Sequence, residues 1–237
     1  MADSSNVSIL TNIFTAPNDA FASLNERPRL LLPTLLLIVS FTVVSFYYLS
    51  HVDMGWFLDN QLRQGGAQFT DAQREQALTA AAKIPPVVYG SIGALSTNFF
   101  VFLVMAIVAG YYTLVSFIAG DGVKYKQWFA LLVWCVLPQL LGQIAVLVNM
   151  SINDPRFMPQ DSINPLSFGN LLSIDRTGAS TVQRVLLGID VTAIWTLVLQ
   201  VLGYQAFSKS SLVRAAAVVL GPLALIVVII TLLALRR

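Results

Sequence analysis

Five amide and hydroxyl side chains inside long apolar segments are the residues that bear most directly on chemistry. Gln139 and Gln143 are four residues apart, as are Thr196 and Gln200, so each pair falls on one face of a helix. Asn98 adds an amide from an earlier segment. In a membrane bundle such groups either line a weakly polar path for a solute or lipid headgroup, or hydrogen-bond between helices. The sequence leaves both interpretations open.

Asp190 is the one acid expected inside a membrane crossing, which we place at residues 185–207. A carboxylate at this position is unfavourable unless it is protonated or meets a cation. Arg184 or Arg176 is near enough along the chain to pair with it, which would make Asp190 a local ion pair or the anion at a helix start. The alternative is a proton-sensitive or cation-binding site. Helical geometry turns Asp190 away from Thr196, so we do not place it on the same path.

The sequence contains no recognisable catalytic or metal-binding motif. Cys135 is the only cysteine, which excludes an intrachain disulfide and a paired-cysteine metal site. His51 is the only histidine, and we expect it at the membrane interface rather than in a ligand set. There is no glycine-rich phosphate loop and no Ser-His-Asp set. The net charge of +2 is too small to indicate nucleic acid. We therefore expect no enzyme activity, no metal, no cofactor and no nucleic-acid partner.

The composition indicates the class of protein. Hydrophobic residues make up 56% of the 237 residues, and there are only 14 Lys+Arg and 12 Asp+Glu. A soluble domain carries about a quarter charged residues, and a helix needs roughly 17–25 apolar residues to cross a bilayer. The sequence predicts an all-α polytopic membrane protein that forms a single membrane domain over residues 1–237. Its five transmembrane helices are expected at about 30–52, 87–118, 127–150, 185–207 and 212–235.

Short amphipathic segments are expected beside the first crossing. Ile9, Ile13 and Phe14 lie at helical spacing, and Pro17 is placed to open a second helix. Residues 1–29 therefore predict one or two helices at the cytoplasmic interface. In the first outer loop, Trp56 begins an aromatic interfacial helix.

Three further positions in the chain carry local signals. Thr70 and Gln73 form a capping box that opens another helix in the same outer loop. In the third crossing, Trp128 is expected at the membrane interface, and Pro138 is expected to kink the helix because it removes a backbone N–H.

The distribution of cations predicts which side each loop occupies. Six Lys and Arg residues fall in short segments close to helix ends if the N-terminus is cytoplasmic, whereas the cations on the other side are diluted through long loops. The orientation we expect is therefore N-terminus in and C-terminus out. The six cations are Arg27, Arg29, Lys124, Lys126, Lys209 and Arg214.

The order of several short motifs resembles the Yip family of polytopic membrane proteins. The best single marker is the set Asp190, Trp195 and Gly203. The resemblance spans nearly the whole chain and looks like a bacterial member of the family. The other motifs, in chain order, are Ile13-Phe14-Thr15-Ala16-Pro17, Phe21, Arg27-Pro28-Arg29, Gly120-Asp121-Gly122, Tyr125, Phe129 and Pro138.

The resemblance implies a non-enzymatic membrane protein in a bacterial inner membrane. Eukaryotic relatives associate with Rab-type GTPases, but that role is not carried over, because their acidic N-terminal motifs are not found here. Our first hypothesis is a scaffold or adaptor that contacts membrane lipid and either another membrane protein or further copies of itself. The alternative is a transporter or lipid-translocating protein that uses the polar path between the second, third and fourth crossings.

Overall fold

The computed structural model describes residues 5–64, 70–174, 179 and 181–235. Within these ranges the regular structure is helical, apart from an isolated bridge between Ser167 and Asp190. Five helical segments are long and apolar enough to cross a membrane, which confirms the predicted all-α polytopic fold. They are α3 (Leu31–His51), α6 (Pro86–Ala119), α7 and α8 together (Tyr125–Cys135 and Gln139–Ile152), α11 (Val191–Ser208) and α12 (Leu212–Leu235).

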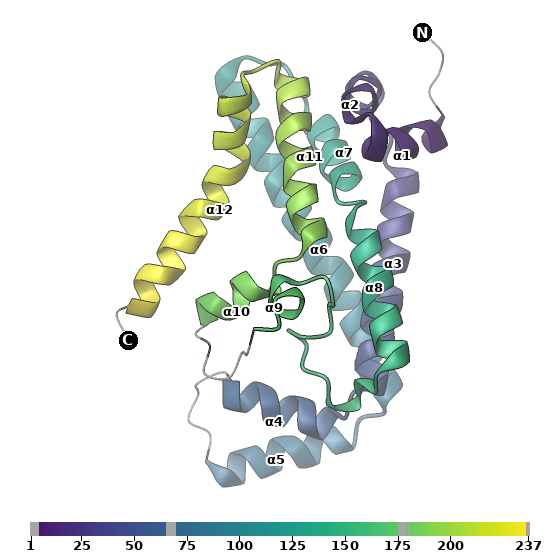
Figure 1. Ribbon diagram of the computed structural model, residues 1–237, viewed down its shortest axis with the longest axis vertical. Helices are drawn as coiled ribbons and strands as arrows, with labels where there is room; N and C mark the ends of the chain where they lie inside the picture. The colour runs from purple at the N-terminus through teal and green to yellow at the C-terminus, as the bar shows by residue number, and fades with distance from the viewer. Residues whose placement is uncertain (1–4, 65–69, 175–178, 180, 236–237) are drawn as a thin grey trace.

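The shorter helices gather toward the two ends of the bundle (Figure 1). One end carries α1 (Asn6–Thr15) and α2 (Pro17–Glu26), and we call it the N-terminal side. Toward the other end, the loop side, lie α4 (Met54–Gln64), α5 (Asp71–Ala82), the 3-10 turn Pro155–Phe157, α9 (Phe168–Leu171) and α10 (Thr181–Gly188).

Local signals position several helix ends, and those at Pro17 and Thr70 were predicted. Pro17 is the first residue of α2, where its missing N–H costs no hydrogen bond. Thr70 and Gln73 form both bonds of the capping box at the start of α5. Gly120 ends α6 with a φ of 73°, a conformation that glycine adopts without steric cost.

The fourth crossing begins later than predicted. Residues from 185 onward were expected in one helix, but α10 ends at Gly188 and α11 begins only at Val191. Between them Asp190 is extended, with φ −117° and ψ 168°. An Asp side chain competes well for the free N–H groups of a helix start, so the chain begins a new helix here.

Pro138 divides the third crossing instead of only bending it. Helix α7 ends at Cys135, and α8 begins at Gln139. The turn between them keeps short-range bonds, with the Gln139 N–H donating to the Val136 carbonyl at 2.9 Å. Backbone that leaves the helical pattern at membrane depth must lie inside protein, and Leu137 is fully buried.

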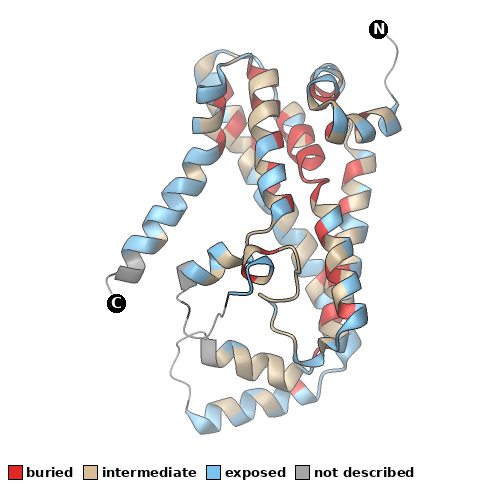
Figure 2. Ribbon diagram, viewed as in Figure 1, coloured by how far each residue is buried: buried red, intermediate tan, exposed pale blue. Residues whose placement is uncertain are grey.

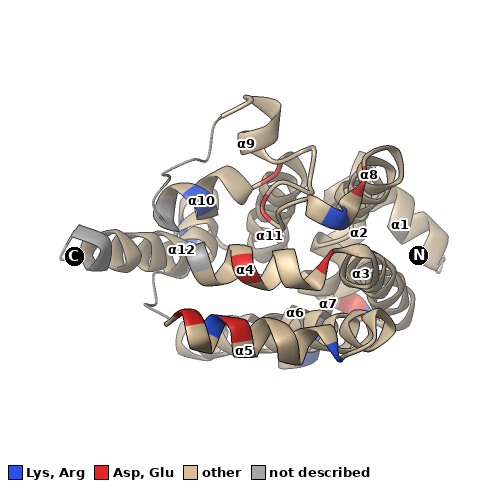
Figure 3. Cartoon of the chain, turned by 90° about the horizontal axis from the view of Figure 1, so that it is seen from below, with Lys and Arg blue, Asp and Glu red and all other residues tan. Residues whose placement is uncertain are grey.

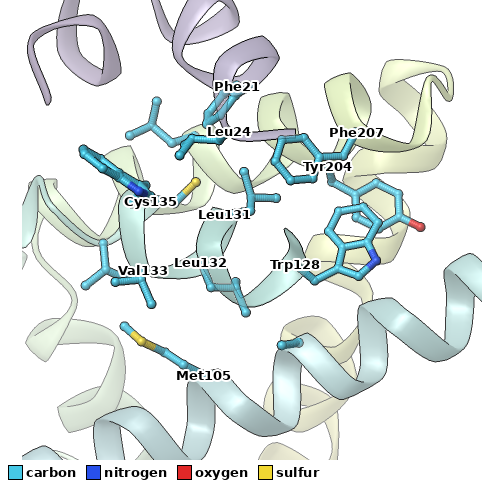
Figure 4. Close-up of a cluster of buried hydrophobic side chains, with 14 of the residues drawn as sticks. Phe21, Leu24, Met105, Trp128, Leu131, Leu132, Val133, Cys135, Tyr204 and Phe207 are labelled. Atoms are coloured by element: carbon cyan, nitrogen blue, oxygen red, sulfur yellow. The ribbon is translucent and has the colours of Figure 1, made fainter. Parts of the chain in front are cut away.

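The main core lies toward the N-terminal side of the bundle, around α7 (Figure 2). Trp128 is its centre: it stacks on Tyr204 at a ring distance of 4.9 Å and meets Tyr112 and Phe207 at 5.5 and 5.6 Å. Figure 4 shows the rings of Trp128, Tyr204 and Phe207 beside the aliphatic side chains of α7. Trp128 is fully buried between helices, so its side chain belongs to the core of the bundle, and its place at the membrane interface stays a prediction.

Candidate functional site

The family-marker residues Asp190, Trp195 and Gly203 lie at the N-cap of α11 or within the helix. Asp190 is the N-cap of α11 and lies outside the helix, which corrects the prediction that it is inside a crossing. Its Oδ1 atom accepts hydrogen bonds from the Ala193 N–H and the Thr192 hydroxyl, each at 2.7 Å. Helical geometry was expected to turn Asp190 away from the face that carries Thr192 and Thr196, but it does not separate Asp190 from Thr192, because helical angles do not apply to an extended residue.

The other carboxylate oxygen of Asp190 holds the long loop of the loop side. Asn164 donates from Nδ2 to Asp190 Oδ2. Asn170 donates in turn to the Asn164 carbonyl at 2.7 Å, and the Phe168 N–H donates to the Ile189 carbonyl at 2.9 Å. One acid therefore fixes both the start of α11 and the loop that covers it.

No cation found among the described residues pairs with Asp190. Arg184, one of the two expected partners, lies 3.6 Å from the Asp161 carboxylate, and Arg176 is outside the described residues. Of the interpretations left open by the sequence, the helix-start anion is the one the structure shows. The proton-sensitive or cation-binding alternative gains no support, because both carboxylate oxygens already accept bonds from protein donors.

Glycine lets α8 approach this site closely. A Cβ atom on Gly142 would lie 3.1 Å from Thr192 Oγ1 and 3.5 Å from Asp190 Oδ2. The Asp190 cluster therefore joins α8, α11 and the loop.

Replacing Asp190 tests this cluster. Asp190→Ala removes a helix cap and leaves Asn164 and Thr192 without their acceptor, so we expect a loss of about 1–3 kcal/mol in the free energy of unfolding. Asp190→Asn keeps a capping oxygen and is expected to cost less than half as much. Unfolding in mixed micelles measures both. Equal stability of Asp190→Ala and the unchanged protein would refute the assignment.

Trp195 and Gly203 hold the N-terminal helices. Trp195 meets Phe14 of α1 edge to face, with ring centroids 5.4 Å apart and planes at 86°. Gly203 faces α7 and α2: a Cβ atom there would lie 2.3 Å from Leu131 Cδ1 and 3.2 Å from Phe21 Cε1. Gly203 is therefore a point of close approach between α2, α7 and α11.

The helix pair α1–α2 is docked on protein through its apolar face. Its anchors are almost fully buried: Ile9, Ile13, Phe21 and Leu24 are at most 1% exposed. Polar bonds secure the connection to the first crossing, with Trp134 Nε1 donating to the Arg29 carbonyl at 2.7 Å. The sequence predicted the apolar face of this pair but carried no signal for what covers it.

Asn98 and Gln200, two of the five path residues, take part in hydrogen bonds between helices. Asn98 donates to Thr42 Oγ1 on α3 and to the carbonyl of Ala94, both at 2.9 Å. The Tyr112 hydroxyl donates to Gln200 Oε1 at 3.4 Å, which links α6 to α11.

The other three path residues are Thr196, Gln139 and Gln143. Thr196 donates to the Thr192 carbonyl of its own helix at 2.9 Å. Gln139 and Gln143 are half-buried on α8. Asn98 lines a groove between α3 and α6, and none of the other four path residues lines it.

Sequence reasoning missed Asn164 as a site residue. Its neighbourhood is a proline-containing loop without periodicity, so nothing local distinguished it from a solvated asparagine. The loop side also carries residues of both charge signs (Figure 3), with ion pairs that include Arg156–Asp154 and Arg184–Asp161. Among them, hydrogen bonds from Arg156 hold the pKa of Asp154 below its ordinary value.

Five membrane-crossing helices, with hydrogen bonds between helices and a helix pair docked at one end, define a polytopic integral membrane protein. The match to a family is consistent with this class: residues 11–233 match the Yip1 domain. The chain belongs to the Yip1 domain family. Comparison with curated proteins and with solved structures finds no match.

Proposed function

We propose that this protein is a non-enzymatic scaffold or adaptor of a bacterial inner membrane, with its N-terminus in the cytoplasm and its C-terminus outside. The observation that carries the proposal is the docking of α1–α2 on α7 and α11, with fully buried anchors such as Phe21 and Leu24. A helix pair held in this way presents its other face in a defined position, which lowers the entropic cost of binding a partner.

The free face of the helix pair is polar. Asn18, Asp19 and Glu26 are exposed there, and the exposed cations Lys124 and Lys126 stand on the same side of the bundle. Cations concentrated near these helix ends support the cytoplasmic orientation. The surface thus suits a water-soluble domain or the cytoplasmic part of another membrane protein.

Cross-linking tests the adaptor role. A photo-reactive amino acid at Asp19 of the full chain, in native membranes, is expected to capture one reproducible polypeptide. The matched control places the same group at Leu114, an exposed apolar residue of α6, and is expected to capture lipid. If both positions capture only lipid, the adaptor role is refuted.

The transporter alternative gains less support from the same structure. The Asn98 amide nitrogen donates to Thr42 of α3, and Gln200 accepts from Tyr112 of α6, so these two groups take part in bonds between neighbouring helices. Purified protein in liposomes is therefore expected to give the same permeability to fluorescent lipid and to small ions as empty liposomes. Flux that Gln139→Leu with Gln143→Leu abolishes would favour transport instead.

A further inference from the structure

The turn between α11 and α12 carries two cations that have no acid partner. Both helices are long and apolar enough to cross the membrane, so residues 209–211, which join them, lie at a bilayer surface. Lys209 begins this turn, and Arg214 lies in the first turn of α12. Both residues are exposed, and within the described part of the chain neither forms an ion pair.

The start of α7 brings two more cations to the same end of the bundle. Lys124 and Lys126 are exposed and form no ion pair with any described residue. Lys124 lies one turn before Trp128, whose ring meets that of Phe207 at 5.6 Å, and Lys209 follows Phe207 by two residues. The start of α7 and the α11–α12 turn are therefore neighbours. We call these residues the tip cations: Lys124, Lys126, Lys209 and Arg214.

The arginines of the loop side differ from the tip cations in this respect. Arg74, Arg156 and Arg184 each pair with an acid of their own side. Asp121, the acid closest to the tip cations along the chain, is partly buried and pairs with none of them. The positive charge of the tip cations is therefore available to a partner.

Exposed apolar side chains accompany the tip cations. Phe117 and Ile118 in the last turn of α6 are 84% and 77% exposed, and Val213 in the first turn of α12 is 81% exposed. The Tyr111 hydroxyl donates to the Val218 carbonyl, which places the end of α6 beside the start of α12. A soluble acidic domain would meet the cations and leave these apolar groups in water. A phospholipid meets both, since its phosphate faces the cations and its acyl chains cover the apolar side chains.

We propose that the tip cations bind the headgroup of an anionic phospholipid at the membrane surface. The attraction between basic side chains and an anionic bilayer acts over about a Debye length and needs no enclosed pocket. The contact goes beyond the adaptor role and does not depend on it, because it requires only that this end of the bundle meets a bilayer.

Lipid titration tests the proposal. Full-length protein in neutral detergent micelles is titrated with short-chain phosphatidylglycerol, and native mass spectrometry measures the fraction of protein that carries the lipid. Lys209→Gln with Arg214→Gln is expected to weaken binding about thirtyfold, because each cation near an anionic headgroup contributes a factor of about five. The matched control, Lys83→Gln with Arg156→Gln, removes two exposed cations from the loop side and is expected to change binding by no more than about twofold.

Three further titrations at constant ionic strength identify the ligand. Phosphatidylcholine, which has no net charge, is expected to bind far more weakly than phosphatidylglycerol. Inorganic phosphate and poly-glutamate are expected to leave bound phosphatidylglycerol in place, because neither covers the apolar side chains. Equal binding of the two lipids, displacement by either anion, or an equal loss in the two double variants overturns the proposal. The adaptor test at Asp19 reads out separately.

Discussion

Gly203→Leu is expected to displace α2 from the bundle and to lower the free energy of unfolding by about 3 kcal/mol, the upper part of the range for overpacked cores. The first added atom alone would lie 2.3 Å from Leu131 Cδ1 and 3.2 Å from Phe21 Cε1. Leu131 and Phe21 are fully buried and have no free space to enter. Hydrogen exchange of the α2 amides, measured in micelles, reports the displacement directly.

Gly110→Leu is the matched control for this substitution. Gly110 lies inside α6, and a Cβ atom there would have no heavy atom within 4 Å. Both substitutions add the same side chain to a helical glycine, so they share the same change in helix propensity. If α2 exchanges at the same rate in both variants, Gly203 does not position the N-terminal helices.

Trp128→Ala is expected to have the largest effect on stability, a loss of about 3–5 kcal/mol. The ring is fully buried and packs against the aromatic rings of Tyr204, Tyr112 and Phe207. Its removal leaves a cavity where α6, α7 and α11 meet, and the surrounding rings can refill it only in part. Denaturant unfolding in mixed micelles measures the loss.

The same chemical change at Trp195 gives the comparison. Trp195 is 36% exposed and meets Phe14 only at one edge, so Trp195→Ala is expected to cost clearly less than Trp128→Ala. Trp128→Phe retains an aromatic ring and should recover much of the loss. Equal losses for the two alanine variants would show that Trp128 is not the centre of the core.

Together, these substitutions separate two roles of α11. Gly203 and Trp195 act toward α1–α2, whereas Asp190 acts toward the loop on the opposite side. If the adaptor proposal is right, Gly203→Leu reduces partner capture from Asp19, while Asp190→Asn leaves it unchanged.

The sequence by itself determined the five crossings and most of the helix starts that depend on local signals. Charge-free apolar runs must form helices in lipid because each backbone group needs a partner within its own segment, and this requirement is local. Pro17 at the start of α2 and the Thr70 capping box are local for the same reason, since every atom involved lies within one turn. The start of α11 was misplaced because the preference of Asp190 for a cap competed with an uninterrupted apolar pattern.

Only the tertiary structure decided which faces meet. It placed Trp128 inside the bundle, paired Asp190 with Asn164, and set Gly203 against Leu131 and Phe21. Lipid tails are as apolar as a protein core, so hydropathy cannot distinguish a side chain that faces lipid from one that faces another helix. That choice depends on the shape and hydrogen bonding of segments far apart in the chain, which become neighbours only after the helices have packed.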